Sequence, residues 1–151
     1  MEQNRKIDAY SFALGVCDAF CEVVRAGVKR IALSHPFTPN ELETVLGGAD
    51  FLNACADIAE KYGCKAYFLR EPVLTDLFPL SLNRGKQNVV FYRDPADLAE
   101  LLSIQADKNA LQGAGKYRGG ARREIAVRFG RLLSYSEEAI GRYLEQNTER
   151  E

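Results

Sequence analysis

The sequence predicts a small α/β domain, with α+β as the alternative: a mixed or parallel sheet of at least three strands, flanked by helices, with a C-terminal helical hairpin. Three observations predict it. Short apolar runs rich in β-branched and aromatic residues occur at 28–34, 64–69 and 88–92, and each is bounded by glycine, proline or polar residues. Segments with apolar residues at three- and four-residue steps separate these runs, which is the helical pattern. Four glycines within 113–120 then precede two further helical segments.

The segments are expected to form one domain in three parts. Residues 1–112 are the predicted α/β core, 113–120 a glycine-rich hinge or loop, and 121–147 a helical hairpin packed on the core. A chain of 151 residues buries about two-thirds of the surface that its unfolded form exposes, so it needs no disulfide or metal to fold.

The composition indicates a water-soluble protein. The chain is 46% hydrophobic and 27% charged, which is close to the average for globular proteins. Because no stretch approaches the roughly 18 apolar residues of a membrane span and the start lacks a secretion leader, we expect a cytoplasmic protein that does not bind membranes. Its four cysteines, Cys17, Cys21, Cys55 and Cys64, are expected to be reduced, and the first three fall on or beside predicted apolar helix faces, where they would be core residues. No C-x-x-C or H-x-x-x-H pair occurs, so we predict no metal site and no cofactor.

Helix boundaries in the first half follow from capping residues. Asp8 is a predicted N-cap, and Gly27 is placed to end the helix that Asp8 begins. Residues 38–41 read Thr-Pro-Asn-Glu, which is a capping box with proline at the first helical position. The helix that follows is predicted to break at the two glycines 47–48 and to end at Gly63. A helical crossover of this length makes the strands at 28–34 and 64–69 parallel to each other.

The second half contains the strand at 88–92, whose direction stays open. Residues 72–87 form either a short helix with a loop or a hairpin, and only the path of this segment decides how the third strand pairs. Asp94 is the predicted N-cap of the next helix, with Pro95 at its first position. Ser136 is the predicted N-cap of the last helix.

Each predicted strand ends in a pair of polar residues before a proline, and these ends are the candidate ligand site. If the three strands are parallel, their carboxyl ends lie at one edge of the sheet, where α/β proteins bind ligands. Two arginines there would hold a carboxylate or phosphate, and a histidine would be placed to transfer a proton. The predicted site residues are Ser34, His35, Arg70, Glu71 and Arg93.

A purely structural explanation of the same pattern is also available. Residues before proline prefer an extended backbone, an aspartate before proline is an ordinary helix cap, and an arginine beside an acid forms a weak surface pair. Catalysis has no support of its own, since His35 is the only histidine and neither a catalytic triad nor a G-x-S-x-G motif is present. We therefore assign no catalytic residue and expect binding rather than catalysis.

The segment 113–131 is strongly basic and predicts a second function. Against one acid, Glu124, it carries six cations: Lys116, Arg118, Arg122, Arg123, Arg128 and Arg131. Such a segment binds nucleic acid, or it is a solvated helix face that pairs with local acids. The hairpin has a faint helix-turn-helix pattern, but two glutamates open its second helix, where they would repel phosphates.

Three functions thus follow from the sequence. The first is recognition of a small anionic ligand, or of a protein partner, at the strand ends. The second is nucleic-acid binding through residues 113–131. The third is self-association through the C-terminal hairpin, which would give a homodimer.

Overall fold

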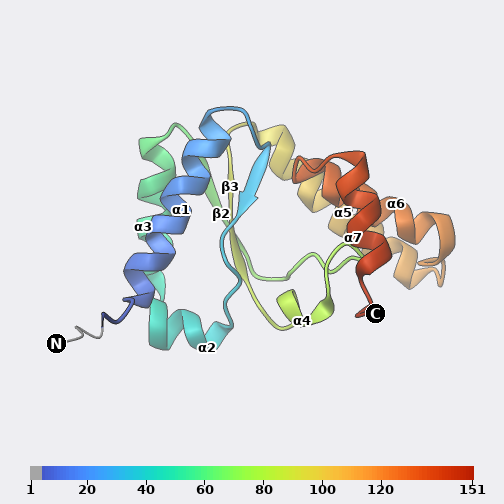
Figure 1. Ribbon diagram of the computed structural model, residues 1–151, viewed down its shortest axis with the longest axis horizontal. Coiled ribbons are helices and arrows are strands. Elements are labelled where there is room, and N and C mark those ends of the chain that lie inside the picture. Colours follow the sequence, from blue (N-terminus) through green and yellow to red (C-terminus); the bar gives the residue numbers. More distant parts are fainter. Residues whose placement is uncertain (1–4) are drawn as a thin grey trace.

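A computed structural model describes residues 5–151 as a three-layered α/β fold (Figure 1). A central sheet is covered on one face by helices α1 (Ala9–Arg25) and α3 (Ala49–Lys61). The other face is covered by α5 (Pro95–Gly113), α6 (Gly119–Leu132) and α7 (Glu137–Gln146). The predicted α/β class, with helices flanking three strands and further helices at the C-terminus, is confirmed.

The sheet contains β1 (Ile31–Leu33), β2 (Lys65–Leu69) and β3 (Asn88–Tyr92) in the order β1-β3-β2. β1 and β2 run in the same direction, as the crossover between them predicts. The predicted mixed or parallel pairing is corrected, however, because β3 lies between them and is antiparallel to both. The reason is the path of residues 70–87. This segment contains only the short helix α4 (Leu80–Asn83), and it leads from the carboxyl end of β2 to the start of β3 at the same end of the sheet. Because this connection contains no long helix that crosses the sheet, the chain re-enters the sheet beside β2 and runs in the opposite direction.

The helices before β2 begin and end at the residues that the capping pattern predicts. In α1 (Ala9–Arg25), Asp8 accepts a hydrogen bond of 3.0 Å from the Ser11 amide. Thr38 caps α2 (Pro39–Glu41), which continues as a π-helical turn, η1 (Leu42–Leu46). The turn stops at Gly47 and Gly48, which both have positive φ. α3 (Ala49–Lys61) follows.

Three helices follow β3 and form the second layer of helices. α5 (Pro95–Gly113) is capped by Asp94, whose carboxylate accepts from the Ala96 amide at 2.9 Å. α6 (Gly119–Leu132) follows a short loop at 114–118, and α7 (Glu137–Gln146) is capped by Ser136. In the part of the chain that the structure describes, no helix is both long and apolar enough to cross a membrane.

Alternate residues of the strands belong to two cores. Ile31 and Val90 pack with α5, α6 and α7, whereas Ala32 and Phe91 pack with α1 and α3. This alternation follows from the two-residue period of a strand. The second core contains the four cysteines, all free and buried, which confirms the predicted core positions of Cys17, Cys21 and Cys55. The Sγ atoms of Cys17 and Cys55 lie 3.9 Å apart.

Candidate anion-binding site

The antiparallel position of β3 separates the two arginines of the predicted site. In the sheet register Leu69 lies opposite Asn88 and Lys65 lies opposite Tyr92. Arg70, which follows β2, therefore lies at one end of the strands, and Arg93, which follows β3, lies at the opposite end. The predicted meeting of Arg70 and Arg93 does not occur, because it required parallel strands.

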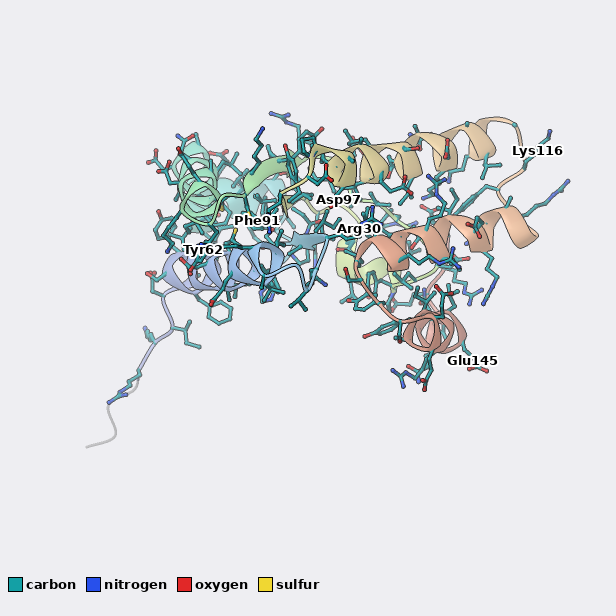
Figure 2. All side chains as sticks on the ribbon, turned by 90° about the horizontal axis from the view of Figure 1, so that it is seen from above. Arg30, Tyr62, Phe91, Asp97, Lys116 and Glu145 are labelled. Carbon is teal, nitrogen blue, oxygen red and sulfur yellow. The ribbon has the colours of Figure 1, made fainter. Side chains whose placement is uncertain are left out.

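Arg93 has a structural contact at its own edge. Its Nη1 donates a hydrogen bond of 2.7 Å to the carbonyl of Arg25, the last residue of α1. A cation at the carboxyl end of a helix satisfies a free carbonyl and complements the helix dipole. Nearby, Arg30 pairs with Asp97 of α5 at 2.7 Å, and both side chains are labelled in Figure 2.

Ser34 and His35 line a different, apolar pocket. The buried Ser34 hydroxyl accepts from the Val89 amide at 2.9 Å and so takes the place of a strand partner. His35 is exposed, with its ring 6.0 Å from that of Phe12. The pocket measures about 250 Å³, and its walls come mainly from α1 and from residues 36–51. Neither Arg70 nor Arg93 lines this pocket, so the five predicted residues divide among three places.

Arg70 and Glu71 line the largest of these hollows, which we call the polar cleft. It has a volume of about 500 Å³ and lies between the carboxyl end of β2, the turn at 85–87 and one side of α5. Its polar lining residues are Arg70, Glu71, Lys86, Gln87, Gln105, Lys108, Asn109, Gln112 and Glu151. Two of the five predicted residues thus belong to one site, and the other members of that site come from segments that the strand-end pattern did not include.

Lys108 is the most informative residue of the polar cleft. Its side chain is only 4% exposed, and its Nζ lies 3.0 Å from a carboxylate oxygen of Glu151. The ammonium also lies 5.4 Å from the centre of the Tyr117 ring. Lysine is almost never this buried unless a negative charge meets it. The cleft wall therefore contains a cation that requires an anion.

Spacing along α5 is the signal that could have found Lys108. It lies four residues after Ile104 and seven after Leu101, both fully buried, so it falls on the inward face of the helix. A lysine at such a position needs a buried partner, but helical periodicity alone does not say which acid supplies it.

Two other cations line the cleft nearer to solvent. The guanidinium of Arg70 lies 4.8 Å from the centre of the Phe68 ring, a cation–π contact that restrains the arginine side chain. Lys86, in the turn after α4, is half-buried. Together with Lys108 they outnumber the two carboxylates of the lining, Glu71 and Glu151, by one charge.

Amide groups supply the remaining polar surface. The Oε1 atoms of Gln87 and Gln105 are buried, and neither has a hydrogen-bond partner among the residues described. A buried acceptor without a partner costs about 1–3 kcal/mol. Because both atoms are buried, a ligand would bond them only after the two side chains turn, whereas Asn109 and Gln112 line the cleft with further amide groups.

A buried ion pair fixes the segment beside the cleft. Arg122 of α6 donates two hydrogen bonds of 2.7 Å to the carboxylate of Asp76. Asn147 donates from its side chain to the Asp76 carbonyl at 2.9 Å. The Arg122 guanidinium lowers the pKa of Asp76 below its usual value. Residues 70–79 are thereby tied to the C-terminal helices.

Local acids pair with half of the basic segment. Besides Arg122, Arg128 lies 2.6 Å from Asp107, and Arg131 lies 2.7 Å from Glu137. Within residues 5–151, the other three cations of the segment form no ion pair: Lys116, Arg118 and Arg123. Lys116 projects from the turn between α5 and α6 at the end far from the sheet (Figure 2). The pairing is what a solvated helix face with neighbouring acids predicts.

The chemistry of the polar cleft depends on the side chains that line it. No group of three or more histidine, cysteine or acidic side chains within the described residues is arranged to hold a metal ion. In comparisons with known proteins, no family model, no curated protein and no solved structure matches this chain significantly.

Proposed function

We propose that this protein recognises a small anionic molecule in the polar cleft. The observation that carries the proposal is the buried Lys108 in the cleft wall, with Arg70 and Lys86 at the same opening. A cation that served only solubility would lie in water, because burying a charge costs free energy unless an opposite charge meets it.

The lining also indicates what else the ligand carries. Arg70 presents a planar guanidinium, which suits a carboxylate or phosphate, and Lys86 adds a mobile point charge. Asn109 and Gln112 line the same cleft, and their amide groups can pair with hydroxyl or amino groups of a ligand. A polar metabolite of a few carbons, with one or two acidic groups and hydrogen-bond donors, fits this set. The proposal is binding without catalysis, since the lining contains no histidine, cysteine or serine.

Thermal unfolding tests the proposal with matched variants. The wild-type chain is screened against inorganic phosphate, citrate, glutamate and glucose 6-phosphate. A ligand at 100 times its Kd stabilises the native state by about 2.7 kcal/mol, which raises Tm by about 5 to 10 °C for a chain of this size. The double variant Arg70→Gln with Lys86→Gln should lose this shift in Tm. The variant Arg93→Gln, at the opposite end of the strands, should keep it.

Two outcomes would contradict the proposal. One is the absence of any shift with all four probes at millimolar concentration. The other is an equal loss in Arg93→Gln and in the double variant, because the effect would then be one of general charge and not of the cleft.

The alternative functions have separate tests. Nucleic-acid binding has weaker support, because only Lys116, Arg118 and Arg123 remain without an ion pair in the described part of the basic segment. It predicts a gel shift at low salt that is lost as salt rises. A homodimer predicts twice the monomer mass by light scattering at micromolar concentration. A cytoplasmic location is part of the proposal, because the four free thiols suit a reducing compartment.

A further inference from the structure

We propose that Lys108 and Gln112 form a carboxylate subsite of the polar cleft, and that the side chain of Glu151 fills this subsite until a ligand carboxylate replaces it. The inference rests on the proposed function and makes it more specific, because it names the acidic group that pairs with the buried Lys108.

Three contacts define the subsite. The Lys108 ammonium lies 3.0 Å from Glu151 Oε2, and the Gln112 Nε2 donates to the same oxygen at 3.4 Å. Arg122 Nη2 donates to the main-chain oxygen of Glu151 at 3.2 Å. The residue is therefore held at both its side chain and its backbone, as a bound acidic compound with a nearby carbonyl would be.

The charge of the subsite matches a carboxylate. Asp76 neutralises Arg122, because both of its carboxylate oxygens accept hydrogen bonds from that guanidinium. When the Glu151 side chain leaves the subsite, the positive charge without a partner is that of Lys108. One carboxylate neutralises one ammonium. A phosphate dianion would leave an extra negative charge in a partly buried site, which is costly.

Exposure indicates which partner can exchange. The Glu151 side chain is 26% exposed, whereas that of Lys108 is 4% exposed, so the anion reaches solvent and the cation does not. The preceding residues are held independently: the Asn147 side chain donates to the Asp76 carbonyl, and the Glu149 carboxylate accepts from the Ser81 amide at 3.1 Å. Opening the subsite requires residues 150–151 to move, which breaks the hydrogen bonds that Arg150 donates to the carbonyls of Leu144 and Asn147.

Chemical rescue tests the subsite directly. Glu151→Ala removes the carboxylate and leaves the Lys108 charge buried without a partner, so Tm should fall. Sodium acetate or propionate should then raise the Tm of Glu151→Ala by about 3 °C more than sodium chloride of equal ionic strength, and more than it raises the wild-type Tm. Inorganic phosphate should give no such excess.

Two controls separate the subsite from a general salt effect. Glu149→Ala removes another carboxylate of the same segment, one that meets Ser81 and no lysine, so acetate should not rescue it more than chloride does. The double variant Lys108→Met with Glu151→Ala removes both charges, and it should be insensitive to acetate. If Glu151→Ala does not fold, Glu151→Gln keeps an acceptor for Lys108, and propionate should still stabilise it more than chloride does.

The outcomes distinguish this inference from the proposed function. Equal responses of Glu151→Ala and Glu149→Ala to acetate, or rescue that persists without Lys108, overturn the subsite. If those results appear while Arg70 and Lys86 still determine ligand binding, the proposed function stands alone. If acetate rescues Glu151→Ala while no probe stabilises the wild-type chain, the subsite stands and the proposed function fails.

Discussion

Gly130 of α6 lies directly against Ile140 of α7. A Cβ atom at Gly130 would be 2.7 Å from Cγ1 and 2.9 Å from Cδ1 of Ile140, and the Ile140 side chain is itself 1% exposed. Both distances are far shorter than van der Waals contact, so the hairpin depends on the absence of a side chain here. The two helices approach as closely as they do because position 130 is glycine.

Gly130→Ala should therefore destabilise the protein, although alanine is the better helix former. Overpacking a buried contact costs typically 1–3 kcal/mol, so we expect a loss of about 2 kcal/mol in the free energy of unfolding, measured by urea denaturation. Gly141→Ala, in α7, is the matched control. A Cβ atom there would meet no other atom within 4 Å, and helix propensity predicts a gain of about 0.5–1 kcal/mol. A Gly130→Ala protein as stable as Gly141→Ala would contradict the packing.

Asp76→Asn should be among the most destabilising single changes in the chain. It leaves the Arg122 guanidinium, 22% exposed, without its bidentate partner, and breaking a buried pair in this way costs about 3–5 kcal/mol. Urea denaturation at pH 7 measures the loss. Glu137→Gln is the control, since the Arg131–Glu137 pair is exposed on both sides and should contribute little. Similar losses in the two variants would show that the Asp76 pair is not special.

The same pair predicts how stability changes with pH. Arg122 lowers the pKa of Asp76 in the folded state, whereas the unfolded chain has the ordinary aspartate pKa of about 3.9. The unfolded state therefore binds the proton first as pH falls. The contribution of Asp76 is fully present above the unfolded pKa and is lost as pH falls through the folded pKa. The stability difference between wild type and Asp76→Asn should shrink from pH 6 to pH 2; a constant difference would contradict this linkage.

The cysteines should be inert in the folded protein. All four are buried, and burial raises the pKa of the Cys21 thiol to about 12, so almost none of it is thiolate at neutral pH. A chromogenic disulfide reagent should react slowly with the native chain at pH 8 and rapidly with all four thiols in 6 M guanidinium, a denaturing concentration. Rapid reaction of even one thiol in the native protein would show that this core opens.

Local patterns predicted the helix boundaries well. The caps at Asp8, Thr38 and Ser136 each bond an amide three residues ahead, and Asp94 bonds one two residues ahead. Such contacts depend only on neighbouring residues, so periodicity and capping chemistry suffice to place them. The same holds for the burial of Cys17, Cys21 and Cys55, which follows from their place on apolar helix faces.

The candidate site could be predicted only in part. Arg70 and Glu71 were found because polar residues after a strand are often near ligands, but the rule assumed parallel strands and so joined them to Arg93. Lys108 and Glu151 were missed because each lies in a different part of the chain, and nothing local to either specifies the other. The contact between them exists only once α5 and the segment after α7 are packed on the same side of the sheet.

The amino-acid sequence by itself determined most of the helices and the three strands, the start of the helices that Asp8, Thr38, Asp94 and Ser136 cap, and which faces are apolar, because these properties arise from interactions within a few residues. Only the tertiary structure decided that β3 runs between β1 and β2 in the opposite direction. The reversed direction of β3 places Arg93 at the opposite end of the strands from Arg70, and Arg70 shares a cleft with Lys86 and Lys108 instead. The physical reason is that strand order depends on how a long connection packs against the whole core.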